Sequence, residues 1–256
     1  MTDAPALPDY PPPRGLLAGK TVLITAAAGT GIGFATAKRC TEEGARVAIT
    51  DIHERRLRES ADAIGAHAVL ANVTSQEDVD HCLADVIGAF GHIDVLVNNA
   101  GLGGTSRLED MTDEQWFTVL DVTLTGTMRM TRAALKHMEP RGSGSIVNNA
   151  SVVGWRAQAG QSHYAAAKAG VMALTRCAAI EAAEQGVRIN AVAPSLAMHP
   201  HLAKVTTEEL LEQLTTQEAF GRAAEPWEVA NVIVFLASDL ASYMTGEVIS
   251  VSSQRA

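Results

Sequence analysis

From Lys20 onward, the chain alternates short runs of β-branched and aliphatic residues with longer segments whose apolar residues recur every three or four positions. The short runs are typical of strands and the longer segments of helices. Some runs are apolar at consecutive positions, as in Val95-Leu96-Val97, which favours strands covered on both faces. The pattern predicts an α/β fold, a doubly wound parallel sheet of about seven strands flanked by helices.

The alternation places each expected element. We expect strands at Val22–Thr25, Arg46–Asp51, Ala66–Ala71, Val95–Asn98, Ser145–Ala150, Val187–Ala193 and Glu247–Val251. We expect helices near residues 32–43, 54–64, 76–89, 112–138, 164–184, 206–217 and 226–237.

The chain is expected to form one domain over residues 16–256, because no linker or repeat interrupts it after residue 15. Residues 1–15 hold five of the nine prolines, so we expect a flexible, extended arm that is held in place late in folding or only by a neighbouring subunit.

Residues 195–222 interrupt the alternation of strands and helices before the last crossover. This segment is the candidate lid over a ligand at the carboxyl edge of the sheet.

Composition excludes several classes of function. A net charge of -9 without a basic run argues against a nucleic-acid partner. No stretch of about 18 uncharged apolar residues is present to cross a membrane, and the first residues do not resemble a signal peptide. The cysteines Cys40, Cys82 and Cys177 are interpreted as free buried thiols of a reducing cytoplasm, and no metal site is expected.

A glycine-rich turn follows the first expected strand. It reads Thr25-Ala26-Ala27-Ala28-Gly29-Thr30-Gly31-Ile32-Gly33 and leads into a helix. Glycines in such a turn let backbone N–H groups approach a pyrophosphate at the helix N-terminus. We therefore expect Thr25, Gly29, Gly31, Ile32 and Gly33 to bind a dinucleotide, although a turn of this kind without a ligand is the alternative.

Asp51 ends the second expected strand, 18 positions after Gly33. An acid near this offset accepts hydrogen bonds from the adenosine ribose hydroxyls and repels a 2′-phosphate. The sequence therefore favours NAD over NADP, unless Arg55 or Arg56 pairs with a phosphate.

Tyr164 and Lys168 lie four positions apart, so one helix face presents a phenol and an ammonium to the same space. A nearby ammonium and a cationic nicotinamide would lower the pKa of the phenol and fit it for acid-base work. Ser151 follows the strand at Ser145–Ala150 and is expected to hold the substrate oxygen beside the phenol. These three residues predict hydride transfer between a nicotinamide cofactor and a carbonyl or hydroxyl carbon.

With these residues in view, the chain resembles the short-chain dehydrogenases/reductases over residues 18–251. The motifs that carry the resemblance are Asn98-Asn99-Ala100-Gly101, the trio Ser151, Tyr164 and Lys168, and Gly246-Glu247 before the last strand. The resemblance implies a single Rossmann-like domain, an NAD(P) cofactor and a homotetramer. It also implies that Asn98, Asn99, Ala100 and Gly101 form the floor of the cofactor site, with Asn98 beside the adenosine ribose.

The resemblance places further residues and also shows departures. Trp155 and Met198 fall in the substrate loops, and Pro194 falls beside the nicotinamide. Asn72 and Val73 stand where the family has an aspartate and valine beside the adenine ring.

Thr123 replaces the usual asparagine of the proton relay, so we expect Thr123 to serve the catalytic site with a shifted water or through its backbone. Two further departures are Ala26 in place of the first glycine and Pro194-Ser195 in place of Pro-Gly.

Three functions are compatible with these features. The first is an NAD-dependent interconversion of a secondary alcohol and a ketone, on a bulky apolar or CoA-thioester substrate of the kind met in actinobacterial steroid degradation. The second is an NADPH-dependent 3-oxoacyl thioester reductase, and the third is a non-catalytic dinucleotide sensor or scaffold. The apolar faces of Val119–Leu135 and Val171–Ala183 predict a homodimer or homotetramer.

Overall fold

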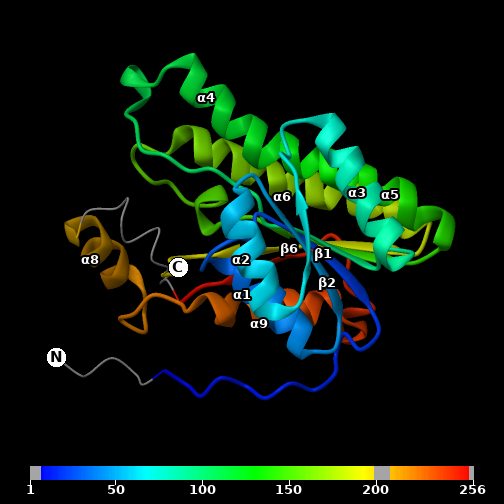
Figure 1. The fold of residues 1–256 in the computed structure, drawn as a ribbon. Coiled ribbons are helices and arrows are strands. Elements are labelled where there is room, and N and C mark those ends of the chain that lie inside the picture. Colours follow the sequence, from blue (N-terminus) through cyan, green and yellow to red (C-terminus); the bar gives the residue numbers. More distant parts are fainter. Residues whose placement is uncertain (1–6, 199–207, 254–256) are drawn as a thin grey trace.

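A computed structural model of the chain describes residues 7–198 and 208–253. Its strands form one parallel sheet at the centre of the molecule (Figure 1). Their order in the sheet is β3-β2-β1-β4-β5-β6-β7. They are β1 (Thr21–Thr25), β2 (Arg46–Asp51), β3 (His67–Leu70), β4 (Val95–Asn98), β5 (Gly144–Asn149), β6 (Val187–Pro194) and β7 (Val248–Val251). The order reverses between β1 and β4, which opens a crevice at the carboxyl ends of these strands. The predicted fold class and number of strands are confirmed.

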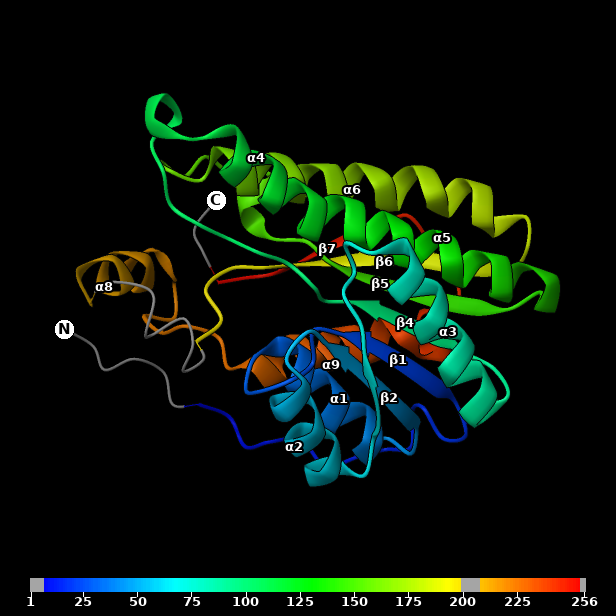
Figure 2. The ribbon, with the colours of Figure 1, turned by 45° about the horizontal axis from the view of Figure 1, so that its top comes forward.

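Helices cover both faces of the sheet (Figure 2). The main helices are α1 (Ile32–Glu42), α2 (Glu54–Ile64), α3 (Gln76–Phe90), α4 (Asp113–Leu120), α5 (Gly126–Met138), α6 (Ser162–Ala183), α8 (Glu208–Gln217) and α9 (Pro226–Ala237). The short helical turns are η1 (Leu108–Asp110), η2 (Asp121–Thr125), η3 (Glu139–Arg141), η4 (Val152–Gly154) and η5 (Asp239–Ala241). Within the described ranges, no helix is both long and apolar enough to cross a membrane.

Two apolar cores lie on opposite faces of the sheet. Ile24 and Ile49 pack toward α1, α2 and α9, while the neighbouring strand positions Leu23 and Ala48 pack toward α3, α5 and α6. Side chains alternate between the faces of a strand, so consecutive apolar residues serve both cores. Each fully buried leucine or isoleucine contributes about 1.5–3 kcal/mol, which explains why these strands are apolar throughout.

The segment predicted as one helix over residues 112–138 is divided into two helices. Between α4 and α5, the π-helical turn η2 widens the backbone by one residue per turn. Gly126 packs against Val73, where a Cβ would lie 2.7 Å from the valine side chain, and Arg129 binds Asp121 at 2.8 Å. These tertiary contacts support the irregular turn, which carries Thr123.

The cysteines differ from one another in burial. Cys40 and Cys82 are buried, and burial raises the pKa of both thiols to about 12, so they stay protonated and inert. The prediction was wrong for Cys177, which is exposed. The buried face of α6 includes Thr175 and Ala178, and Cys177 lies on the face turned away from the sheet.

The described part of the proline-rich arm, residues 7–15, contains no helix or strand and is bound to its own chain. The Tyr10 hydroxyl donates to Glu42 at 2.6 Å, and the Tyr10 ring meets the Trp227 ring edge-on at 5.4 Å. The guanidinium of Arg39 donates to the backbone carbonyls of Pro11 and Pro12. These contacts join the arm to α1 and α9.

Candidate active site

The glycine-rich loop joins β1 to α1 at the carboxyl edge of the sheet. Gly29 has a φ of 101°, in the region that favours glycine, and Ala26 has a φ of 50°, which is strained for a residue with a Cβ. Gly31 is the N-cap of α1 and Ile32 its first residue, and no side chain caps the helix. The first N–H groups of α1 therefore remain available to an anion, as the prediction for Gly31 and Ile32 requires.

Gly33 is required for packing within the loop itself. A Cβ at Gly33 would lie 2.5 Å from both the Ala26 carbonyl oxygen and the Asn99 side-chain nitrogen. Any side chain would push α1 away from the end of β4. The glycine thus holds the loop in place, whatever it contributes to a ligand.

Asn99 is a central residue of this edge, for which the sequence predicts a place in the floor of the cofactor site but no role of its own. Its amide nitrogen donates to the carbonyls of Thr25 and Ala26 at 3.2 Å and 3.0 Å, and its side-chain oxygen accepts from Asn149 at 2.9 Å. The Thr25 hydroxyl accepts from the backbone N–H groups of Asn99 and Ala100 at 2.9 Å and 3.0 Å. Thr25 and Ala100 thus lie together at the carboxyl edge, and their contact with a cofactor stays a prediction.

Asn98 is placed differently from the expectation. Its side chain is only 2% exposed and donates to the Thr131 hydroxyl and to Asn148 Oδ1, both at 2.9 Å. The Asn98 amide therefore joins β4, β5 and α5 inside the molecule and does not reach the edge. The alternation of strand residues between faces is the signal that separates Asn98 from Asn99.

The residues predicted to bind the adenosine half of the dinucleotide lie around the glycine-rich loop. Asp51 ends β2 and accepts from the backbone N–H groups of Ala28 at 3.3 Å and His53 at 3.0 Å. Ser60 of α2 also contacts the loop, because its hydroxyl accepts from the Gly29 N–H at 2.9 Å. Asn72 is exposed and its side-chain oxygen accepts from Thr74, whereas Val73 is buried.

The three predicted catalytic residues come from β5 and α6. Ser151 follows β5 and caps η4, where its hydroxyl accepts from the Val153 N–H at 3.3 Å. Tyr164 and Lys168 lie one turn apart on α6, and the lysine ammonium is 5.6 Å from the centroid of the tyrosine ring. The phenol, the ammonium and the serine hydroxyl thus meet at one edge.

In the chain without a cofactor, burial determines the direction in which the pKa values of Tyr164 and Lys168 shift. It raises the pKa of Tyr164, and only the hydrogen bond with Ser151 opposes this rise. Burial also lowers the pKa of Lys168 to about 8. The lowering of the Tyr164 pKa that is expected from Lys168 together with a cationic nicotinamide requires the bound cofactor and stays a prediction.

Lys168 is held by the backbone of β5. Its ammonium donates to the Asn149 carbonyl at 2.5 Å, and only 3% of the residue is exposed. A Cβ at Gly101 would lie 3.3 Å from the ammonium nitrogen and 3.8 Å from the Thr123 hydroxyl. Gly101 thus lies between Lys168 and Thr123.

Thr123 is fully buried, and its hydroxyl is already used. It accepts from the Leu102 N–H at 3.0 Å and donates to the Leu102 carbonyl at 3.2 Å. The Thr123 carbonyl accepts from the Thr127 hydroxyl at 2.8 Å. The structure therefore gives the side chain a positioning role, in which it holds the loop after β4. A proton relay through a shifted water or through the Thr123 backbone stays a prediction.

The predicted substrate residues lie on the loops around the trio. Trp155 follows η4 and is half exposed, and Met198 is half-buried, with its N–H donating to the Ala224 carbonyl. Pro194 ends β6 and is buried. His163, beside Tyr164, is 2% exposed and without a hydrogen bond in the described part of the chain, and it packs against Gly104.

The candidate lid is described only in part, because residues 199–207 lie outside the described residues. Glu218 anchors its base and is a residue that the sequence interpretation missed. Its carboxylate accepts from the Leu196 N–H at 3.4 Å and from the Ser253 hydroxyl at 2.7 Å. The lid assignment stays a prediction.

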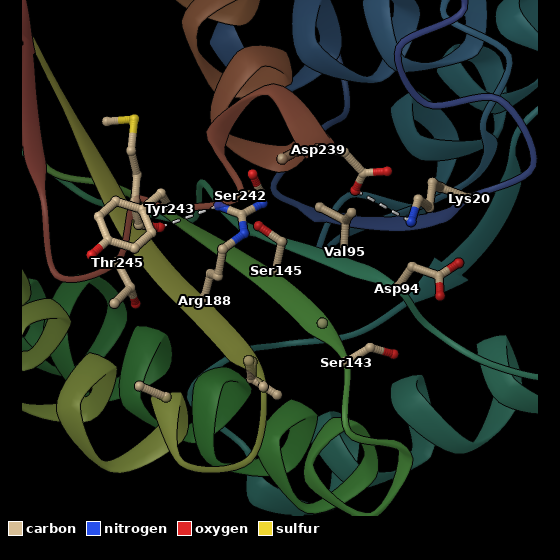
Figure 3. A pocket seen from close by; sticks show the side chains of 16 residues that line it. Lys20, Asp94, Val95, Ser143, Ser145, Arg188, Asp239, Ser242, Tyr243 and Thr245 are labelled. Atoms are coloured by element: carbon tan, nitrogen blue, oxygen red, sulfur yellow. Dashed lines mark hydrogen bonds and ion pairs between the residues drawn. The ribbon is translucent and has the colours of Figure 1, made fainter.

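A cavity of about 640 Å³ lies at the opposite, amino edge of the sheet (Figure 3). Lys20 pairs with Asp239 at 3.7 Å there, and Arg188 donates to the carbonyls of Ser238 and Met244. None of the predicted site residues lines this cavity. The chemistry therefore belongs to the carboxyl edge.

The residues at the carboxyl edge fit a nicotinamide dinucleotide. The uncapped N-terminus of α1 suits a pyrophosphate, Asp51 suits ribose hydroxyls, and Asn149 Oδ1 is a buried acceptor without a protein partner in the described ranges. Within those ranges, no group of three or more histidine, cysteine, aspartate or glutamate residues is placed to hold a metal ion.

Comparisons with known proteins point the same way. A family model described as Enoyl-(Acyl carrier protein) reductase matches residues 26–253. The chain is 62% identical to (5R,7aS)-5-hydroxy-7a-methyl-1-oxo-2,3,5,6,7,7a-hexahydro-1H-indene-carboxyl-CoA reductase of Mycobacterium tuberculosis, over 94% of this chain and 95% of the relative. It is 40% identical to a 3-oxoacyl-acyl-carrier-protein reductase of Thermotoga maritima, over 92% of this chain and 97% of the relative.

Among solved structures, a short-chain dehydrogenase from Mycobacterium smegmatis superposes with a TM-score of 0.88 at 58% identity, covering 98% of this chain and 99% of the other. These relatives are named as reductases and dehydrogenases, and Ser151, Tyr164 and Lys168 lie together at the carboxyl edge of this chain. The chain is an oxidoreductase, so the interpretation as a non-catalytic sensor or scaffold is set aside.

Proposed function

The chain belongs to the short-chain dehydrogenase/reductase family, and from that premise we propose that it is an NAD-dependent enzyme interconverting a secondary alcohol and a ketone. The proposed substrate is a bulky, apolar CoA thioester of the kind met in steroid degradation. The observation that carries the reaction type is the meeting of Ser151, Tyr164 and Lys168 beside the glycine-rich loop.

Each member of the trio has a distinct task in this proposal. The Ser151 hydroxyl and the Tyr164 phenol hold the reacting oxygen, and the phenol donates a proton to a ketone or takes one from an alcohol. When bound, the nicotinamide cofactor supplies or accepts the hydride. Lys168 stays near the phenol because the Asn149 carbonyl holds its ammonium.

The preference for NAD rests on Asp51. Its carboxylate lies at the end of β2, next to the loop, where a 2′-phosphate would meet a like charge. Arg55 is turned to Glu59 at 2.8 Å and is exposed, so it is not held toward a phosphate.

Turnover with NADH and NADPH tests this preference, and faster turnover with NADPH would contradict it. Asp51→Ala should improve the relative use of NADPH by roughly tenfold, since one removed like charge near a surface is worth about 1 kcal/mol or more. Asp62→Ala, a change to an exposed acid on α2, is the matched control.

The substrate class is supported by the 62% identical relative, which is named as a reductase of a bicyclic carboxyl-CoA. The half-exposed Trp155 and the half-exposed Leu102 offer apolar surface on the loops around the trio. A screen should compare CoA thioesters of fused-ring ketones or alcohols with linear 3-oxoacyl-CoA thioesters, each with both cofactors. Higher kcat/KM with linear substrates would overturn the proposed class.

The alternative, an NADPH-dependent 3-oxoacyl thioester reductase, is supported by the 40% identical Thermotoga maritima relative. Asp51 argues against it, and so does the closer relative with a ring-bearing substrate. Preference for NADPH together with linear thioesters in the same screen would establish this alternative.

We also propose a cytoplasmic homodimer or homotetramer. Phe117 on α4 and Ile180 on α6 are 64% and 76% exposed in the single chain, which is costly for large apolar side chains. Sedimentation at micromolar concentration should show a dimer or tetramer, and a monomer would contradict the proposal. Ile180→Asp, which places a charge on this surface, should weaken association.

A further inference from the structure

A chain of hydrogen bonds fixes the orientation of the Asn149 amide. One end of the Asn99 amide faces the carbonyl oxygens of Thr25 and Ala26, which only accept, so that end must be the NH₂ group. The Asn99 oxygen therefore faces Asn149, and the nitrogen of Asn149 donates to it at 2.9 Å. It follows that Asn149 Oδ1 points away from Asn99. The oxygen and nitrogen of an amide have nearly the same shape, so this assignment comes from the hydrogen bonds.

Asn149 Oδ1 is buried and has no hydrogen-bond partner among the described residues. Leaving a buried acceptor unmatched costs about 1–3 kcal/mol. The oxygens of Asn98 and Asn231 are also unmatched, but Asn98 is enclosed between β4 and α5, and Asn231 lies on α9. Asn149 alone among these three also contacts a catalytic residue, because its carbonyl holds Lys168.

The position of β5 in the sheet indicates which half of a dinucleotide Asn149 meets. Asp51 ends β2, and β5 lies three strands away in the order β2-β1-β4-β5. At a spacing of about 4.8 Å between strands, the two residues are separated by roughly 14 Å along the edge. If Asp51 faces the adenosine ribose, the end of β5, next to Lys168, faces the nicotinamide half.

We propose that Asn149 is a further cofactor-binding residue, whose side-chain oxygen accepts a hydrogen bond from an N–H or O–H group on the nicotinamide half of the bound dinucleotide. This contact rests on the proposed use of a nicotinamide cofactor. Asn149 then makes three contacts. Its side-chain oxygen binds the cofactor, its side-chain nitrogen donates to Asn99, and its backbone carbonyl accepts from Lys168.

Calorimetric titration with NAD⁺, NADP⁺ and ADP tests the contact, because ADP carries the adenosine and phosphates but lacks the nicotinamide half. Asn149→Ala should raise the Kd for the preferred dinucleotide about fivefold to tenfold, as expected for one hydrogen bond, and leave the Kd for ADP within about twofold. Asn231→Ala removes another unmatched amide oxygen and should change neither value. Asn149→Ser should behave as Asn149→Ala does, and it replaces that variant if the alanine chain does not fold.

An equal loss of dinucleotide and ADP binding would mean that Asn149 acts only through Asn99 and the loop, and would overturn the contact. No loss of dinucleotide binding would overturn it as well. A wild-type chain that binds neither NAD⁺ nor NADP⁺ would instead overturn the proposed function, and the contact with it.

Discussion

The hydroxyl of Thr123 forms two hydrogen bonds with the backbone of Leu102, one from its N–H and one to its carbonyl. Thr123 thereby joins the π-helical turn η2 to the loop that leaves β4, and Gly101 of that loop lies against Lys168. A residue in the position of a proton carrier thus holds the backbone beside the catalytic lysine.

Replacing Thr123 separates these two roles. Thr123→Val keeps the shape but leaves the Leu102 groups unmatched, so we expect about 1 kcal/mol lower stability and roughly tenfold lower kcat/KM from a displaced loop. Thr123→Ser keeps the hydroxyl and should stay near wild type. Steady-state kinetics and urea unfolding check both values, and an increase in turnover for Thr123→Asn would favour a direct part in the proton relay.

Tyr164→Phe removes only the phenol oxygen. We expect kcat to fall on the order of 10³-fold because the acid-base group is lost, while NAD⁺ binding stays within about twofold. Turnover and calorimetric titration measure the two effects. Tyr243→Phe, at a fully exposed tyrosine, is the control and should change neither.

Lys168 is expected to lower the stability of the fold at neutral pH. Burial lowers its pKa from 10.5 to about 8, so at pH 7 the folded chain holds a charge that the unfolded chain solvates better. Between pH 8 and pH 10.5 the unfolded chain binds more protons, and this group's contribution to stability rises with pH.

Lys168→Met should therefore raise the free energy of unfolding at pH 7 by about 1–2 kcal/mol, after subtraction of the lost hydrogen bond to Asn149. The gain over wild type should shrink at pH 9.5. Urea unfolding at both pH values measures it, with Lys136→Met on the exposed face of α5 as the control. A gain that does not change with pH would contradict this explanation.

Ala26 has a φ of 50°, so its Cβ is strained in the loop. Ala26→Gly should raise the free energy of unfolding by roughly 0.5–1 kcal/mol, since relief of the strain exceeds the extra chain entropy of glycine. Thermal unfolding would show the shift. Ala28→Gly, in the same loop without a positive φ, should lower stability instead.

Much of the fold was predictable because consecutive apolar residues such as Leu23 and Ile24 are required wherever a strand is covered on both faces. The trio of Ser151, Tyr164 and Lys168 was predictable for a similar reason, since a strand end and one turn of helix determine where they lie. The burial of a strand on both faces and the spacing of residues along a helix can both be predicted from the sequence alone.

Other features depend on contacts between distant segments and were not predictable. The π-helical turn is supported by Val73, which packs against Gly126, and by the pair of Asp121 and Arg129. The place beside the adenosine ribose was assigned to Asn98 because the resemblance gave only the motif, and it is the faces of β4 that separate the buried Asn98 amide from the Asn99 amide. The pKa of Tyr164 depends on how deeply the phenol is buried, which spacing does not reveal.

The edge-on contact between Tyr10 and Trp227 makes the N-terminal segment observable in solution. Trp227 lies in the first turn of α9, shortly after the candidate lid, so its fluorescence emission should report the undocking of the arm separately from the loss of activity.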